Sequence, residues 1–380
     1  MIRESASVTM QNQLDFKKLI NELLTASVHG LSSMYDTNSN LFCYRVKKTA
    51  HGLMKEGHSL RYTIISLLGL KRLQAHTGES PIDIQSLLHA LIDKSHDIDN
   101  IGDIGLLLWL CALAAPERVE RLYADLAIHS ALSRFPDARR GKTTEIAWFL
   151  TGLTYIASVP IQKPKGFESL TRNTYELLKK NYGGKGIFGH QNKSSLAGMI
   201  RGRIGCFADQ VYPIYALSKY AQAYNNKEAL TIAKECGETI CHLQGPLGQW
   251  WWHYDANMGS AIGRYPVYSV HQDGMAPMAL YSLQDACGLD CGGAIKKGLL
   301  WITGNNELDF DLRDTSQNMI WRSFYQKKWK KYYERLYSLY SINQTHSNSH
   351  DLMILFECRP YHLGWLLYAF ADKGNAVTGK

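Results

Sequence analysis

The chain has 380 residues, and its 42 lysines and arginines outnumber its 34 aspartates and glutamates, which gives a formal net charge of +8. Hydrophobic residues make up 45% of the chain and charged residues 20%, a composition that excludes a disordered or fibrous protein. Because the basic excess is moderate and many acids accompany it, the sequence argues against a nucleic-acid partner and leaves room for an anionic ligand.

The N-terminal sequence and the apolar runs predict where the protein resides. The first residues, MIRESASVTMQNQLDF, contain no apolar stretch of the roughly 7–15 residues that a signal peptide requires. The longest apolar run, from Ile104 to Ala115, has twelve residues, fewer than the roughly 20 that cross a bilayer. We therefore expect a cytoplasmic protein without a membrane span, whose 8 cysteines are reduced thiols.

Apolar residues recur at helical spacing through almost the whole chain, whereas strand-like alternation is scarce. Turn signals such as Gly183-Gly184 and Asn225-Asn226 separate the helical segments. No linker or low-complexity stretch divides the chain, so we expect one domain over residues 1–380, with an irregular N-terminal segment and a C-terminal tail. The predicted helices cover residues 13–32, 58–76, 81–93, 101–114, 116–134, 143–158, 166–182, 207–225, 227–242, 268–287, 292–302, 315–340 and 354–372.

Six of these helices resemble one another, since each begins with a short polar patch and continues as an almost unbroken apolar run. They are RYTIISLLGL from Arg61, GDIGLLLWLCAL from Gly102, TEIAWFLTGL from Thr144, ADQVYPIYAL from Ala208, QDGMAPMAL from Gln272 and YHLGWLLYAF from Tyr361. Aligning them gives one equivalent polar position, occupied by Tyr62, Asp103, Glu145, Asp209, Asp273 and His362. In four of them a glycine or alanine follows seven residues later, at Gly69, Gly152, Ala216 and Ala369.

A helix that is apolar on all sides is buried, whereas a helix with one apolar stripe lies on the surface. Six buried helices that alternate with amphipathic ones therefore predict an inner ring inside an outer ring, an all-α (α/α)6 toroid of six helical hairpins. Such alternation makes the inner helices parallel and brings their polar N-terminal patches to one face as a funnel. The expected lining is Arg61, Tyr62, Asp103, Glu145, Asp209, Gln210, His271, Gln272, Asp273, Arg359, Tyr361 and His362.

In this arrangement the sequence resembles the six-hairpin glycosidase superfamily. Its members hydrolyse or eliminate at uronic acid and other sugar units in a cleft at the same end of the barrel. The resemblance covers most of the chain at the level of architecture and implies an oligo- or polysaccharide substrate.

Asp209 and Asp273 are the candidate catalytic acid/base pair, because glycoside hydrolysis needs one carboxyl group to protonate the leaving oxygen and a second to activate water or attack the sugar. His271 is expected to assist them as an acid or base near neutral pH. Aspartate is also a favoured residue at the start of a helix, where it accepts backbone N–H bonds. For Asp103 and Glu145 this capping role is the favoured interpretation.

The segment 248–274 predicts a β-hairpin at the rim of the funnel, since aromatic and β-branched residues flank a turn-like ANMGS sequence. An indole ring can cover the apolar face of a sugar, although large aromatic residues are usually buried. We expect at least one tryptophan of this segment to be core and one to face a ligand, together with His253 or Asp255. The three tryptophans are Trp250, Trp251 and Trp252.

Arginines near the funnel are the candidate ligands of a sugar carboxylate. Arg359, at the start of the last inner helix, can bind such a group, anchor a loop or pair with an inner-ring acid. Arg203 ends the glycine-rich segment 183–205, which lacks the pattern of a phosphate-binding loop. Tyr212 is a further candidate for contact with the substrate. The string of lysines and aromatic residues over 324–337 is interpreted as a solvated outer helix.

Together these features predict an enzyme that hydrolyses, eliminates or epimerises at a unit of an anionic, uronate-type saccharide. No cofactor is expected. No metal site is expected either, because the cysteine and histidine spacings lack the short pairs of structural zinc sites. Two alternatives remain: a toroid that processes terpenoid or prenyl substrates, and a non-catalytic saccharide-binding scaffold in polysaccharide biosynthesis.

Overall fold

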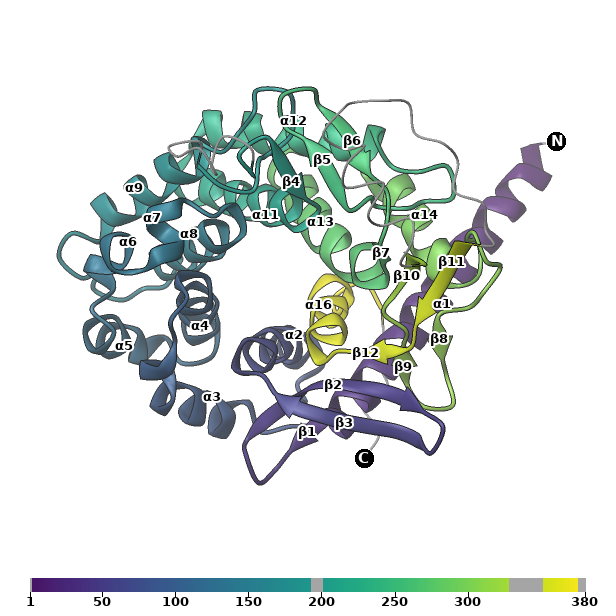
Figure 1. Ribbon diagram of the computed structural model, residues 1–380, viewed down its shortest axis with the longest axis horizontal. Helices are drawn as coiled ribbons and strands as arrows, with labels where there is room; N and C mark the ends of the chain where they lie inside the picture. The colour runs from purple at the N-terminus through teal and green to yellow at the C-terminus, as the bar shows by residue number, and fades with distance from the viewer. Residues whose placement is uncertain (1, 193–200, 328–350, 375–380) are drawn as a thin grey trace.

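A computed structural model describes residues 2–192, 201–327 and 351–374. Its helices form a closed ring of two layers (Figure 1). The inner layer consists of α2 (Leu60–Thr77), α4 (Ile101–Ala114), α8 (Thr143–Ser158), α11 (Ala208–Tyr224), α13 (Ala276–Cys287) and α16 (Pro360–Phe370). Each inner helix contacts the next, and α16 returns to contact α2, which closes the ring. The predicted (α/α)6 toroid is therefore confirmed, with its six apolar segments as the inner helices.

The outer layer carries the amphipathic helices (Figure 1). These are α1 (Ile2–Met34), α3 (Ile84–Asp93), α5 (Val119–Asp125), α6 (Ala131–Arg134), α7 (Pro136–Arg140), α9 (Phe167–Lys179), α12 (Lys227–His242) and α14 (Gly292–Ile302). In α9 the buried residues recur at helical spacing along one face, whereas α4 is buried almost all round. This contrast matches the two kinds of apolar pattern in the sequence. No described helix combines the length and the apolar composition needed to cross a membrane.

Glycines let two pairs of inner helices approach to backbone contact. A Cβ atom at Gly69 of α2 would overlap with the carbonyl oxygen of Gly364 in α16. A Cβ atom at Gly152 of α8 would overlap in the same way with the carbonyl oxygen of Gly105 in α4. Gly69 and Gly152, two of the four small residues that recur at the same position of the inner helices, therefore lie where α2 meets α16 and where α4 meets α8.

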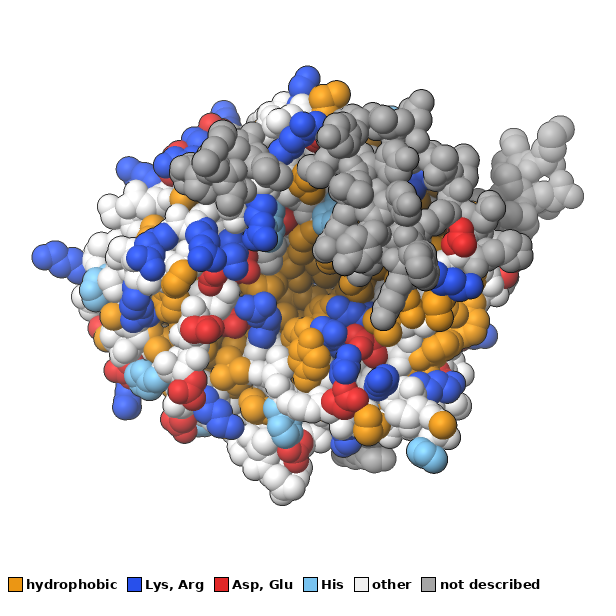
Figure 2. Space-filling model, in the orientation of Figure 1, with side chains coloured by type: hydrophobic (Ala, Val, Ile, Leu, Met, Phe, Trp, Pro, Cys, Tyr) orange, Lys and Arg blue, Asp and Glu red, His pale blue; other side chains and the backbone are white. Residues whose placement is uncertain are grey.

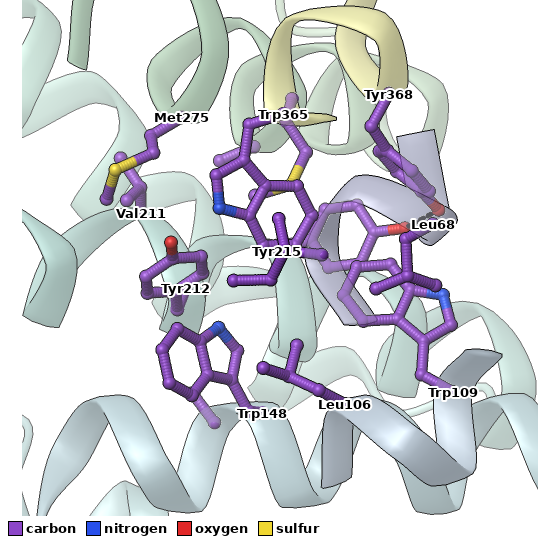
Figure 3. Close-up of a cluster of buried hydrophobic side chains, with 14 of the residues drawn as sticks. Leu68, Leu106, Trp109, Trp148, Val211, Tyr212, Tyr215, Met275, Trp365 and Tyr368 are labelled. Atoms are coloured by element: carbon purple, nitrogen blue, oxygen red, sulfur yellow. Dashed lines mark hydrogen bonds between the residues drawn. The ribbon is translucent and has the colours of Figure 1, made fainter. Parts of the chain in front are cut away.

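Aromatic side chains fill the inside of the ring (Figure 3). The hydroxyls of Tyr155, Tyr215 and Tyr368 hydrogen-bond to one another at 2.6–2.9 Å. The indole of Trp109 lies 5.1–5.2 Å from all three tyrosine rings, measured between ring centroids. Because every hydroxyl finds a partner within this group, the barrel interior can bury three polar atoms without leaving one unsatisfied.

Short strands stand at the end of the ring where the inner helices begin. The predicted rim hairpin is confirmed as β5 (His253–Asp255) and β6 (Ser260–Gly263), with β4 (Ile204–Cys206) beside β5. A longer hairpin of β2 (Leu41–Thr49) and β3 (Gly52–His58) pairs with β1 (Tyr35–Asp36) and β12 (Glu357–Cys358). The remaining strands are β7 (Val267–Tyr268), β8 (Arg313–Asp314), β9 (Met319–Ile320), β10 (Ser323–Gln326) and β11 (Leu352–Leu355).

Three parts of the helix prediction are wrong. The expected helix over 315–340 begins with β9 and β10, and β10 pairs on both sides, with β7 and β11, which turns Phe324 into the core. The expected helix over 354–372 starts only at Pro360, after β12. The segment 116–134 is divided into α5, α6 and short 3₁₀ turns. Residues 328–337 of the lysine-aromatic string lie outside the described residues.

We predict that Gly69→Ala lowers the free energy of unfolding by at least about 1–3 kcal/mol, because the added methyl group overpacks a backbone contact that cannot yield. Urea denaturation measures the difference. The matched control is Gly293→Ala in the outer helix α14, where a Cβ atom meets nothing within 4 Å, so stability should be unchanged or slightly higher. Equal effects of the two substitutions would show that the α2–α16 seam tolerates a side chain.

Candidate active site

The open end of the ring is hollowed at its centre (Figure 2). Four inner segments begin directly after a rim strand: β3 leads into α2, β4 into α11, β7 into the π-helical turn His271–Met275 that precedes α13, and β12 into α16. The polar patches of the inner helices therefore meet near the rim strands, as the alternation of inner and outer helices requires.

Asp103 and Arg61 form an ion pair between the first turns of α4 and α2. The Arg61 Nε donates to Asp103 Oδ1 at 2.5 Å, and its Nη2 donates to Oδ2 at 3.2 Å. The guanidinium also lies over the Trp148 ring, 5.2 Å from its centroid. Burial raises the pKa of Asp103, although Arg61 acts against this shift. The cap of α4 is Asn100, whose side chain accepts two backbone N–H bonds, so the expected capping role of Asp103 is corrected.

Glu145, in the first turn of α8, is a buried carboxyl group with an oxygen that lacks a partner. Its Oε2 is inaccessible to solvent and has no hydrogen bond within the described part of the chain. Burial is the largest cause of its raised pKa, and the charge of Asp209 adds to the shift. Its Cα atom would lie 3.0 Å from a Cβ atom placed on Gly102. The backbone of Glu145 therefore lies beside Gly102, the residue before Asp103. The carboxyl group of Glu145 thus favours its protonated form.

Asp209 is fully buried at the start of α11 and orients a histidine that sequence analysis did not identify. Its Oδ1 accepts a hydrogen bond from Thr144 Oγ1 at 2.9 Å, and its Oδ2 accepts one from the Cys206 N–H at 2.9 Å. The Nδ1 of His190 lies 3.0 Å from the same Oδ2. This hydrogen bond is the main cause of a raised pKa at His190, whose side chain is 35% exposed. The signal was weak because His190 stands in an irregular glycine-rich segment.

Asp273 is held away from the funnel surface. Its side chain is fully buried, and both carboxylate oxygens lie 2.7–2.9 Å from Nε2 of His362, which is itself buried. Burial raises the pKa of Asp273. His271 is also buried, in contact with Phe207 and Trp252, and burial lowers its pKa to about 3. Asp273, His362 and His271, which were expected to line the funnel, are therefore all buried.

The two predicted glutamines bind backbone groups of the rim. Gln210 exchanges hydrogen bonds with the backbone of Phe188 at 2.8–3.0 Å. Gln272 accepts from the Trp250 N–H at 3.3 Å and donates to the Tyr268 carbonyl at 3.2 Å. Both glutamines, which were expected to contact substrate, are fully buried and hold the segments that precede their helices.

Of the three consecutive tryptophans, Trp250 and Trp251 are buried and Trp252 is partly exposed. Trp252 stacks on His271 with an interplanar angle of 6° and packs against Tyr268 at 4.9 Å. The expectation that some of these residues are core thus holds, and Trp252 is the one left to face a ligand.

The other rim candidates of this segment and its neighbour carry out structural roles. Asp255 is buried, and its Oδ1 accepts the backbone N–H groups of Asn257 and Met258 in the hairpin turn. Arg203 is bound to its Oδ2 at 2.7 Å. His253 is partly exposed on β5, opposite Cys206 and Gly263. Arg203 and Asp255 therefore neutralise each other at the rim.

Two arginines near the last inner helix share one buried carboxylate. Arg359 Nε and Arg322 Nε lie 2.9 and 3.1 Å from Oε1 of Glu357. Arg359 also donates to the Tyr62 hydroxyl at 2.8 Å, and Tyr62 packs against Tyr361 with ring centroids 4.6 Å apart. Arg322 was missed because it lies within the wrongly predicted helix over 315–340. Its guanidinium lies 4.9 Å from the Tyr268 ring centroid.

Aromatic rings lie between the acidic wall, which Asp103 and Glu145 form, and the arginine wall, which Arg322 and Arg359 form. Trp148 of α8 packs edge-on against Tyr212 of α11 at 4.8 Å, and Tyr212 packs against Trp365 of α16 at 5.9 Å. All three are buried or nearly so, and Figure 3 shows them turned toward one another inside the ring. They make a largely apolar floor between charged walls. In the described residues, no group of three or more His, Cys, Asp or Glu side chains is arranged to hold a metal ion.

The fold of this chain is shared by solved structures of carbohydrate-cleaving enzymes. No protein-family model matches the chain, and no curated protein matches it by sequence. Solved structures of the same shape include an unsaturated glucuronyl hydrolase specific for heparin, with 13% identity and a TM-score of 0.55 over 93% of this chain and 96% of the other.

Two further structures show the same likeness. The unsaturated glucuronyl hydrolase of Bacillus sp. GL1 has 14% identity and a TM-score of 0.57, with 93% of this chain and 96% of the other covered. The GH76A α-1,6-mannanase of Salegentibacter sp. HEL1_6 has 13% identity and a TM-score of 0.58, with coverages of 93% and 98%. These likenesses confirm the predicted toroid fold.

We predict that Asp273→Ala destabilises the protein by about 3–5 kcal/mol, because it leaves the buried imidazole of His362 without its partner. Chemical denaturation measures the loss. Asp285→Ala, at an exposed position of α13, the helix that follows the turn of Asp273, is the control and should change stability by less than about 0.5 kcal/mol. A stable Asp273→Ala protein without activity would return Asp273 to the catalytic machinery.

The neutral state of His271 predicts a pH-dependent stability. A pKa of about 3 in the folded protein, against about 6.5 in the unfolded chain, means that the unfolded chain binds more protons below pH 6.5. The contribution to stability is present above about 6.5 and falls by about 3 kcal/mol on going from pH 7 to pH 4. The variant His271→Leu should show a shallower loss over this range. A slope equal to that of the original protein, with exposed His129→Leu as control, would contradict a buried neutral imidazole.

Proposed function

We propose that this protein is a glycoside hydrolase that cleaves a uronate-type, anionic saccharide unit bound in the funnel. The observation that carries the proposal is the environment of Glu145: a buried carboxyl oxygen without a partner in the described chain, a raised pKa, and the nearby Arg61, which binds the carboxylate of Asp103 and also interacts with Glu145. Two carboxyl groups whose surroundings differ in this way are suited to the separate roles of acid and base.

In this mechanism Glu145 gives its proton to the glycosidic oxygen as the bond from that oxygen to the sugar carbon breaks. Asp103, held on Arg61, accepts a proton from the water that adds to the sugar carbon. The negative charge of Asp103 also stabilises the positive charge that develops on the sugar ring in the transition state. His190, fixed through Nδ1 by Asp209, leaves Nε2 available to hold a hydroxyl of the sugar.

The arginine wall supports an anionic substrate. Arg322 and Arg359 share Oε1 of Glu357, so their remaining N–H groups can bind a carboxylate in the bidentate manner that guanidinium groups favour. Solved structures of this fold include unsaturated glucuronyl hydrolases, and one aspartate-to-asparagine variant from Streptococcus agalactiae is in complex with dGlcA-GalNAc6S. The acids and arginines at the starts of the inner helices favour a substrate that is polar throughout over a terpenoid or prenyl substrate, most of whose surface is hydrocarbon.

A panel of uronate-containing oligosaccharides, with their neutral counterparts, tests the proposed activity through release of reducing sugar. We predict that Glu145→Gln lowers kcat by about a thousandfold, since general acid catalysis contributes about 10²–10⁴, with little change in KM or melting temperature. In the original protein kcat/KM should fall as the pH rises above the raised pKa of Glu145, because the acid loses its proton.

The matched control is Glu168→Gln, because Glu168 stands in the first turn of the outer helix α9 and is exposed. It should retain full activity. Binding of the oligosaccharides without turnover by the original protein would favour the non-catalytic scaffold. Preference for neutral over uronate-containing sugars would contradict the role of Arg322 and Arg359.

A further inference from the structure

Arginines at the rim beside α7 carry positive charge that no acid of the described chain neutralises. Arg139 and Arg140 end α7, and Arg201 precedes β4; all three are exposed. None of them forms an ion pair within residues 2–192, 201–327 and 351–374, although neighbouring cations do. Figure 2 shows a group of lysine and arginine side chains over α7 and the start of α8, at the edge of the central hollow.

Backbone hydrogen bonds place these arginines on both sides of one short segment. The Asn192 N–H donates to the carbonyl oxygen of Arg140 at 3.3 Å, and the His190 N–H donates to the carbonyl oxygen of Arg201 at 3.1 Å. The imidazole of His190 reaches Asp209 in the candidate active site. We call Arg139, Arg140 and Arg201 the arginine strip. His190 links this strip to the candidate active site, because its backbone binds Arg201 and its side chain binds Asp209.

Two other cations of the same rim are paired with acids and so do not contribute to the excess of positive charge. Lys142 pairs with Asp137 at 2.9 Å, and Arg203 pairs with Asp255 at 2.7 Å. The opposite charges within each pair largely cancel at the position of a ligand. The excess positive charge of this rim is therefore carried by Arg139, Arg140 and Arg201. Such a surplus attracts a polyanion and raises its local concentration at the hollow.

We propose that Arg139, Arg140 and Arg201 bind the part of an anionic polysaccharide chain that extends out of the funnel over α7. The inference rests on the proposed function, because a saccharide with one unit in the funnel must leave past the rim. A linear chain with a carboxylate on each unit fits a strip of separated guanidinium groups. A nucleic acid is less suited, since the described strip offers phosphate contacts but no aromatic face on which exposed bases can stack.

The test measures the Kd of oligogalacturonates, from the disaccharide to the octasaccharide, by isothermal titration calorimetry. Glu145→Gln serves as the background to prevent turnover. We expect affinity to rise with chain length on this background. Adding Arg139→Gln, Arg140→Gln and Arg201→Gln should weaken octasaccharide binding by roughly tenfold, as three exposed charge contacts contribute, and leave disaccharide binding unchanged. The length dependence should diminish at high salt.

The control adds Arg121→Gln, Lys227→Gln and Lys297→Gln, which remove the same charge from exposed positions of outer helices. This protein should keep the length dependence, and Arg140→Gln alone should reduce it if the triple variant does not fold. Affinity that does not increase with length, or equal losses in both triple variants, would overturn the proposal. Binding of oligodeoxythymidylate with the same dependence on these arginines would replace the polysaccharide with a nucleic acid. Because binding is measured without turnover, failure of the proposed hydrolysis is seen separately in the reducing-sugar assay.

Discussion

Backbone contact between inner helices is the constraint on which the site depends. The α4–α8 seam requires Gly105 and Gly152, since a side chain at either would overlap with the facing helix. The same close approach continues to the helix starts, where Gly102 meets the backbone of Glu145. Asp103 and Glu145 are therefore neighbours because the helices that carry them have almost no space between them.

The second seam closes the ring. Gly69 in the first inner helix meets Gly364 in the last, and this contact joins segments that are almost 300 residues apart in the sequence. It places Tyr62 against Tyr361 and within reach of Arg359. Asp103 and Glu145 stand on helices joined by one glycine seam, and Tyr62 and Arg359 lie at the starts of helices joined by the other.

Apolar pattern alone was sufficient to predict the inner helices, because a buried helix must be apolar on every side. The roles of the acids at their starts could not be predicted in this way. Asp103, Asp209 and Asp273 share this local position with Glu145, yet each of the three binds a different partner. These partners are Arg61, His190 and His362, which lie 42, 19 and 89 residues away in the sequence. The rim strands other than the predicted hairpin of β5 and β6 were missed for a related reason: strands as short as β10 take their direction from the strands on either side.

Part of the net charge of +8 is explained by arginines that outnumber the acids around them. Glu357 is bound by Arg45, Arg322 and Arg359, and Arg45 shares a second acid, Glu56. Arg322 and Arg359 therefore face one buried carboxylate, that of Glu357, whereas Arg45 and Glu56 form a partly exposed pair beside it. Like charges in such a place repel one another strongly, because the surrounding dielectric screens them less than water does. In the proposed function, a substrate carboxylate beside Arg322 and Arg359 would relieve this repulsion and a neutral sugar would not.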